Sequence, residues 1–262
     1  MSLAELQRDA STGIATITVN RPQVLNAIDV PTAKAIRAAV EPLQGDSSVR
    51  CIVLRGAGRA FVAGGDLGKF AEDFRRAADV VDDLLDALHP AIRILRAHDA
   101  PVIASVQGAV AGAGLSLMAS CDLTIAAEGT RFIVAYDRIG ATPDCGGTWF
   151  LPRLLGSRRA AQFMLLGETW DSATAREMGL VNYVVPAEEL EQQTLGFAQR
   201  IAAGPTRAYG SYKRLAAQAL GEGLPAHLER EREAFKAATR TDDFREGVSA
   251  FLGKRAAAFK GH

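Results

Sequence analysis

The sequence has little cysteine, no net charge and no long apolar run. Its three cysteines, Cys51, Cys121 and Cys145, are odd in number and widely spaced, so neither a disulfide framework nor a CxxC metal site is readable. Thirty basic and thirty acidic side chains cancel, so charge gives no reason to expect nucleic acid or a membrane as a partner. Glu5 and Asp9 interrupt the N-terminal segment, and no later run reaches the ~18 apolar residues of a membrane span. We therefore expect a cytoplasmic protein in a reducing compartment.

The composition is that of a globular chain, with 48% hydrophobic and 23% charged residues. A chain of 262 residues can bury one substantial core without a disulfide or metal. Short β-branched runs predict strands at 13–19, 49–54, 102–106, 123–126, 132–135 and 180–185. Helical periodicity predicts helices at 33–43, 70–95, 158–166, 187–202, 207–220, 226–238 and 244–252. We predict an α/β core over residues 1–200 and a helical region over residues 201–262.

A stretch of small residues, from Gly108 to Gly114, follows one predicted strand and opens an apolar helix. Small residues bring backbone N–H groups close to an anion or a developing oxyanion at the start of that helix. Close packing of the helix on the sheet would produce the same pattern. A dinucleotide site does not fit, because the last glycine of GxGxxG is missing and no lysine follows as in a P-loop.

A second small-residue turn, Ala63-Gly64-Gly65-Asp66-Leu67, also lies between a predicted strand and a predicted helix. Asp66 is suited to cap that helix. Two such turns can aim two backbone donors at one carbonyl oxygen, which is the geometry of an oxyanion hole. A plain capped loop is the alternative.

Three side chains outside these turns are candidates for chemistry. Asp144 either caps a helix that begins near Gly146 or acts as a base from a loop on a rigid scaffold. Cys145 is either a thiolate nucleophile or a small buried residue, and no histidine or lysine lies near it in the sequence. His89 is either a base or donor, or a histidine at a helix end before a proline. The other histidines have no partner at metal-ligand spacing, so no metal site is predicted.

Five motifs, in this order and spacing, resemble the crotonase superfamily, which is the enoyl-CoA hydratase/isomerase family. They are NRPQVLNA at 20–27, AFVAGGDL at 60–67, the stretch 108–122, PDCGGTW at 143–149 and REGVSAFLGKR at 245–255. Each motif alone is a weak signal, but together they span nearly the whole chain. PDCGGTW and the GVSAFL ending resemble most the ring-1,2-epoxyphenylacetyl-CoA isomerases of phenylacetate catabolism.

The resemblance implies a crotonase-like spiral of ββα units, with C-terminal helices that form a homotrimer or a dimer of trimers. It implies an acyl-CoA substrate and no separate cofactor, because coenzyme A is part of the substrate. The N–H groups of Gly65 and Ala113 would hold the thioester oxygen and stabilise an enolate, by ~3–4 kcal/mol for one such donor. The residues assigned to CoA are Gln23, Val24, Leu25, Ala63 and Leu67, together with Phe251 and Lys254 of the same or a neighbouring subunit.

Two positions depart from the family's hydratases, in which a pair of glutamates holds and activates water. Here these positions are Ser116 and Tyr136, and a hydroxyl is a poor base at neutral pH. Asp144 stands where isomerases of the epoxyphenylacetyl-CoA type and 4-chlorobenzoyl-CoA dehalogenases carry an aspartate. One carboxylate can move a proton between two carbons. We therefore expect an isomerase with Asp144 as the proton shuttle, acting in double-bond migration or epoxyphenylacetyl-CoA ring isomerisation.

Three alternatives stay open at this point. The first is an enoyl-CoA hydratase. The second is a 4-chlorobenzoyl-CoA dehalogenase-like hydrolase, in which Asp144 attacks an aryl carbon and His89 activates water. The third is a non-catalytic CoA-binding protein of the same fold. An acyl pocket that is blocked, or CoA that binds without reaction, would favour the third.

Overall fold

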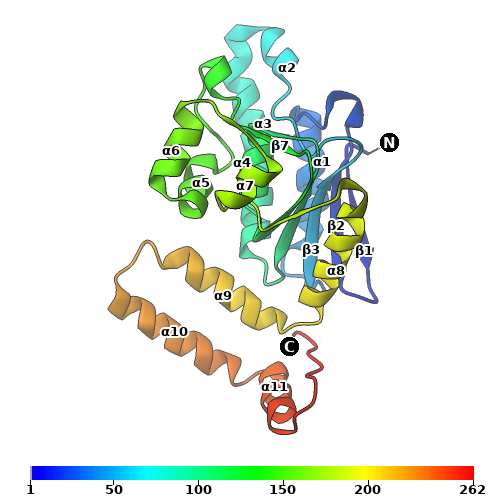
Figure 1. The fold of residues 1–262 in the computed structure, drawn as a ribbon, viewed down its shortest axis with the longest axis vertical. Helices are drawn as coiled ribbons and strands as arrows, with labels where there is room; N and C mark the ends of the chain where they lie inside the picture. The colour runs from blue at the N-terminus through cyan, green and yellow to red at the C-terminus, as the bar shows by residue number, and fades with distance from the viewer. Residues whose placement is uncertain (1) are drawn as a thin grey trace.

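A six-stranded sheet lies at the centre of the molecule, which the computed structural model describes over residues 2–262 (Figure 1). Its strands run in the order β1 (Ala4–Asp9), β2 (Ile14–Val19), β3 (Cys51–Gly56), β4 (Val102–Val106), β6 (Leu123–Ala127) and β9 (Tyr183–Val185). β1 pairs antiparallel with β2, and the later strands pair in parallel. A second sheet consists of β5 (Ala109–Ala111), β7 (Arg131–Ile133) and β8 (Thr169–Asp171). Burial of both faces explains why β3 and β4 are almost continuously apolar.

Helices cover both faces of the large sheet. α1 (Val30–Val40) packs against α3 (Ala77–Ala97) over one face, and α8 (Leu190–Ala202) contacts β3, β4 and β6 on the other. The side chains of β3 alternate between the two resulting cores, since Ile52 and Leu54 join the first and Cys51 and Val53 join the second.

The remaining helices position the loops and form the C-terminal region. The α-helices are α2 (Leu67–Ala71), α4 (Ala113–Ala119), α5 (Gly147–Leu155), α6 (Ser157–Leu165), α7 (Ser172–Glu177), α9 (Thr206–Gln218), α10 (Leu224–Ala238) and α11 (Asp242–Leu252). Short 3-10 helices are η1 (Pro22–Val24), η2 (Glu41–Leu43), η3 (Phe74–Arg76), η4 (Asp137–Ile139) and η5 (Ala187–Glu189). In the described chain, residues 2–262, no helix has the length and apolarity to cross a membrane.

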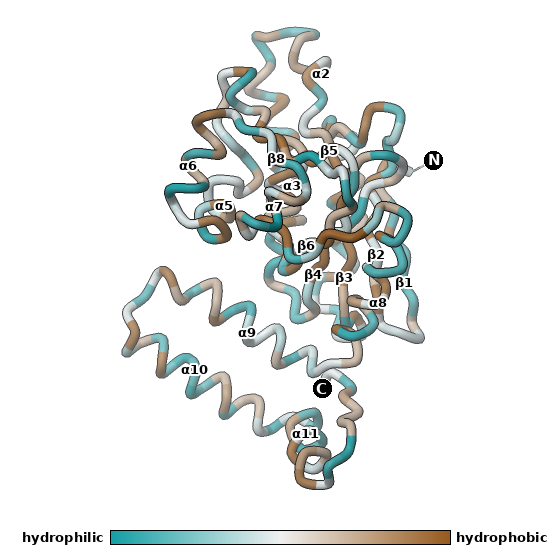
Figure 2. The backbone as a smooth tube through the Cα atoms, in the orientation of Figure 1, coloured by the Kyte–Doolittle hydropathy of each residue, from teal (hydrophilic) through white to brown (hydrophobic). Residues whose placement is uncertain are grey.

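The last two helices stand away from this body (Figure 1). α9 is tied to the body by Lys213, whose ammonium donates to the Ala100 carbonyl at 3.0 Å and pairs with Asp122 at 2.9 Å. Within the described residues, none of α10 is buried. Hydrophobic residues are scattered along α10 but concentrated on β4 and β6 (Figure 2). The predicted α/β fold with a helical C-terminal region is therefore confirmed.

The predicted helix over 70–95 is wrong at its start. The structure has α2, η3 and then α3 in its place. The break occurs at Asp73, whose backbone is extended and whose carboxylate accepts a hydrogen bond from the Arg75 N–H at 3.1 Å. This local side-chain bond competes with the helical ladder and ends α2.

The alternative in which His89 stands at a helix end is also wrong, because α3 continues through Pro90 to Ala97. A proline inside a helix leaves the carbonyl four residues earlier without its N–H partner. That carbonyl belongs to Asp86, and the guanidinium of Arg37 on α1 donates to it at 3.3 Å. A donor from a neighbouring helix thus replaces the missing hydrogen bond.

Three strands were not predicted. β1 is an exposed edge strand with little apolar alternation, and β5 and β8 have only three residues each. The strand predicted at 132–135 ends earlier because Ala135 has a φ of 65°, which is outside the range of a strand.

Candidate active site

The two small-residue turns meet beside β5. The Ala111 N–H donates to the Val62 carbonyl at 3.0 Å and aligns the turns. Gly64 and Gly112 then touch, and both have positive φ, 92° and 49°. A Cβ atom on Gly112 would lie 3.5 Å from the Cα of Gly64. Glycine at both positions therefore permits an approach that the backbone conformation would disfavour for other residues.

The two backbone donors expected at these turns have no hydrogen-bond partner in the part of the chain that the structure describes. Across residues 2–262, no carbonyl accepts from the N–H of Gly65 or from that of Ala113. Ala113 begins α4, where the first N–H groups lack intrahelical acceptors. The backbone of Ile28 runs alongside this turn but does not pair with the Gly65 N–H. Its N–H donates to the Gly64 carbonyl at 2.8 Å, and its carbonyl accepts from the Asp66 N–H at 2.9 Å. Two unpaired donors therefore adjoin the contact between the turns.

Asp144 does not cap a helix. α5 begins at Gly147 with Gly146 at its cap, and no side chain caps it. Instead, the Oδ1 atom of Asp144 accepts a hydrogen bond from the Tyr136 hydroxyl at 2.6 Å. The structural alternative that the sequence left open for this aspartate is therefore wrong.

Tyr136 joins Asp144 to the small-residue turn at Gly112. It is 8% exposed, and burial, followed by the negative charge of Asp144, raises the pKa of its hydroxyl. The hydroxyl therefore keeps its proton and donates to the carboxylate. The Tyr136 ring lies against Gly112, where an added Cβ would be 3.9 Å from its Cζ. Ser116 is buried 3.5 Å from the Tyr136 hydroxyl.

The structure supports neither a thiolate nucleophile at Cys145 nor a pairing of His89 with Asp144. Cys145 is buried, and burial together with the charge of Asp144 raises the pKa of its thiol, so it stays protonated. His89 is exposed on α3, and its ring takes part in none of the hydrogen bonds among the described residues. Among the hydrogen bonds of residues 2–262, none joins His89 to Asp144.

The first group of residues assigned to CoA lies together. The Ala63 N–H donates to the Leu25 carbonyl at 3.1 Å, which brings the 23–25 segment next to the turn at residues 63–67. Gln23, Val24 and Leu67 are exposed there. A ligand can therefore reach this edge from solvent.

Asn26 builds this edge, although in the sequence it stands out only as part of the motif at residues 20–27. It is fully buried, and its Nδ2 donates to the carbonyls of Ala57, Ala60 and Phe61 at 2.9, 2.8 and 3.0 Å. The backbone of this buried turn gives Asn26 a positive φ of 58°. Because φ is a property of the folded backbone, the identity of the residue alone did not reveal this role.

Phe251 and Lys254 lie far from these residues. Phe251 is 84% exposed on α11. α2, which begins at Leu67, is at the opposite end of the molecule (Figure 1). Within one chain, the two groups assigned to CoA are therefore not brought together.

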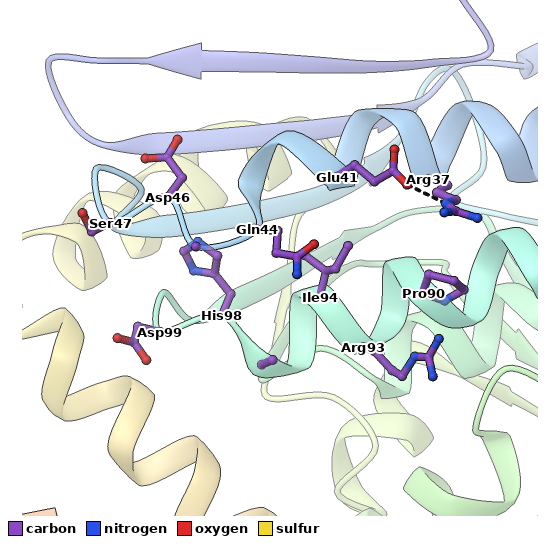
Figure 3. Close-up of a pocket in the computed structure, with 12 residues that line it drawn as sticks. Arg37, Glu41, Gln44, Asp46, Ser47, Pro90, Arg93, Ile94, His98 and Asp99 are labelled. Carbon is purple, nitrogen blue, oxygen red and sulfur yellow. Dashed lines mark hydrogen bonds and ion pairs between the residues drawn. The ribbon is translucent and has the colours of Figure 1, made fainter.

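A separate groove of about 570 Å³ lies between η2 and the end of α3 (Figure 3). Its lining includes Arg37 of α1, Glu41 of η2, Asp46 of the following loop, and Arg93 and His98 at the end of α3. It includes none of the candidate site residues. Among residues 2–262, no three His, Cys, Asp or Glu side chains cluster as metal ligands.

Comparison with known proteins extends the motif resemblance to the whole chain. The sequence model described as enoyl-CoA hydratase/isomerase matches residues 9–262. The chain is 37% identical over 250 residues to the 1,2-epoxyphenylacetyl-CoA isomerase of Escherichia coli, covering 95% of each protein. It is 38% identical over 261 residues to a Rhodobacter capsulatus protein named "Probable enoyl-CoA hydratase", covering 100% of each. The crystal structure of an enoyl-CoA hydratase from Polaromonas sp. JS666 matches with a TM-score of 0.91 and 31% identity, covering 98% of this chain and 99% of that one.

Proposed function

The chain belongs to the enoyl-CoA hydratase/isomerase family, and on this premise we propose that it is an acyl-CoA isomerase with Asp144 as its proton shuttle. The observation that carries the proposal is the hydrogen bond of 2.6 Å from Tyr136 to Asp144. Through the Tyr136 ring, which lies against Gly112, it ties a carboxylate to the turn that leads into Ala113. Ser116 and Tyr136 supply hydroxyls rather than further carboxylates, which favours proton relocation over activation of water.

The reaction begins with the thioester oxygen of the substrate bound by the N–H groups of Gly65 and Ala113. These donors stabilise the negative charge that develops on the oxygen when a proton leaves the α-carbon, and loss of one such donor costs ~3–4 kcal/mol in other enzymes. Asp144 takes that proton and returns it to another carbon of the acyl chain. The double bond moves, while the composition of the substrate is unchanged.

The carboxylate is arranged for this transfer. Tyr136 donates a hydrogen bond to its Oδ1 atom. A carboxylate has several acceptor positions, so one hydrogen bond from Tyr136 leaves it able to accept the substrate proton. The Cys145 thiol beside it stays protonated and does not compete as a base.

The acyl group follows from the relatives only as a proposal. The similarity to 1,2-epoxyphenylacetyl-CoA isomerase favours a ring epoxide of phenylacetyl-CoA, and simple double-bond migration uses the same enolate. Relatives named as hydratases make water addition the competing reaction. Water addition needs a group that orients and activates water, and the two hydroxyls are poor bases.

We also propose that the active unit is a homotrimer or a dimer of trimers. Phe251 and Lys254 would then reach the CoA of a neighbouring copy, which agrees with their distance from Leu67 within one chain (Figure 1). Large apolar side chains on α9, α10 and α11 are exposed in a single chain, and contact with neighbouring copies would bury them. They include Tyr212, Leu224, Phe235 and Phe251, each at least 66% exposed. Light scattering that finds a 27.8 kDa monomer at micromolar concentration would contradict this assembly.

A panel of acyl-CoA substrates followed by mass spectrometry tests the reaction. Crotonyl-CoA, a 3-enoyl-CoA, epoxyphenylacetyl-CoA and 4-chlorobenzoyl-CoA distinguish isomerisation at constant mass from gain of water and from exchange of chlorine for hydroxyl. Asp144→Asn keeps the shape of the side chain and removes the base, so kcat should fall at least ~10²-fold with little change in binding. A variant with near wild-type kcat, or faster hydration than isomerisation in the wild type, would refute the proposal.

A further inference from the structure

Arg21 lies between β2 and η1, and its guanidinium is the centre of an ion-pair cluster. Nη1 donates to Asp66 Oδ2 at 2.7 Å and to the Ala27 carbonyl at 3.0 Å. Nη2 lies 3.3 Å from Asp29 Oδ2, and the side chain of Arg21 is only 15% exposed. One cation therefore connects Ala27, the start of α1 at Asp29 and the turn at residues 63–67.

Asp66 directly follows Gly65, so a shift of Asp66 moves the chain beside the Gly65 N–H, which belongs to the Gly64–Gly65 peptide unit. The Asp66 N–H donates to the Ile28 carbonyl at 2.9 Å, and its Oδ1 accepts from the Gly68 N–H at 3.2 Å. These bonds hold the backbone and the near side of the carboxylate. Arg21 holds the remaining oxygen.

Two carboxylates converge on this one guanidinium. Burial acts to raise the pKa of Asp29, but hydrogen bonds from Thr32 and the charge of Arg21 outweigh burial and lower it. The nearby cation Lys69 is already paired with Glu72 at 2.7 Å. Without Arg21, Asp29 and Asp66 would repel each other, and the turn would move to separate them.

An arginine is required for this arrangement. Its planar, rigid fork of five N–H donors can serve two carboxylates and a carbonyl at once, whereas the ammonium of a lysine acts as a single point charge on a flexible stem. We propose that Arg21 is a positioning residue, which holds the Gly65 N–H where it meets the thioester oxygen. This inference rests on the proposed function, since it assumes that the oxygen binds there.

The test uses the full-length protein and the variants Arg21→Met, Arg21→Lys and Asp66→Asn. Arg8→Met is the matched control, because Arg8 also pairs with an aspartate, Asp46 at 2.7 Å, at a site outside the turn. The first readout is the infrared frequency of a ¹³C-labelled thioester carbonyl in bound butyryl-CoA, which reports how strongly the donors polarise it. The second is the separation of kcat from KM with a 3-enoyl-CoA.

We expect Arg21→Met to lose most of the binding-induced shift of the carbonyl frequency. Its kcat should fall roughly 10- to 100-fold, less than the ~10²–10³ for deleting a donor outright, because the amide is displaced rather than removed. KM should change less than about threefold, since uniform binding is kept. Arg21→Lys and Asp66→Asn should lose part of the frequency shift and part of kcat. If Arg21→Met does not fold, these two variants test whether Arg21 positions the Gly65 N–H. Arg8→Met should match the wild type.

Two failures can be told apart. A wild-type protein that leaves the carbonyl at its frequency in water would overturn the proposed function and this inference with it. A wild-type shift that persists unchanged in Arg21→Lys and Asp66→Asn would overturn the inference alone.

Discussion

Tyr136→Phe removes one oxygen atom and with it the hydrogen bond of 2.6 Å to Asp144. The phenyl ring still fills the same space against Gly112, so the packing is retained. A hydrogen bond to a charged group contributes about 1.5–3 kcal/mol. The contact of Ser116 with the same hydroxyl is 3.5 Å, too long to contribute much. If the bond holds the carboxylate in its reactive position, kcat should fall roughly 10- to 100-fold, since each 1.36 kcal/mol is about tenfold in rate.

The assay is the initial rate of double-bond migration in a 3-enoyl-CoA, measured for Tyr136→Phe, Asp144→Asn and the double variant. Because Tyr136 acts through Asp144, the double variant should be no slower than Asp144→Asn alone. Tyr183→Phe is the control, since that hydroxyl takes part in no hydrogen bond of the described chain and the ring packs on Phe197. An unchanged or higher kcat in Tyr136→Phe, or additive losses in the double variant, would refute the reasoning.

Three further outcomes are expected. Burial, followed by the charge of Lys213, lowers the pKa of His98 below 6.5, so the unfolded chain takes up a proton that the folded chain does not. The free energy of unfolding should therefore fall as the pH drops below about 6.5. Measured by urea unfolding between pH 7.5 and 5.5, it should fall less in His98→Asn than in the wild type. Lys213→Met breaks the buried pair with Asp122 and should lower the free energy of unfolding by about 3 kcal/mol in the same assay at pH 7.5, whereas a loss under 1 kcal/mol would contradict this. Burial raises the pKa of the thiols of Cys51, Cys121 and Cys145, to about 12 in the first two. A thiol reagent at pH 8 should therefore modify no cysteine in the native protein and all three after denaturation.

The sequence by itself determined the features that depend on neighbours along the chain. β-branched runs placed most strands of the large sheet, because burial on both faces demands apolar residues at successive positions. The start of α4 followed from its small residues, and Asp66 caps α2 as predicted. The five motifs likewise indicated the family, which the match over residues 9–262 confirms.

Only the tertiary structure decided which partner each side chain meets. Asp144 had the spacing of a helix cap, but the loop before α5 turns it to Tyr136, eight residues earlier. His89 stood before a proline that typically ends a helix, but Arg37, 49 residues from Asp86, supplies the missing donor. Local patterns report what a segment prefers in isolation. The hydrogen bonds that override those preferences come from segments that the fold brings alongside, and no spacing in the sequence reveals them.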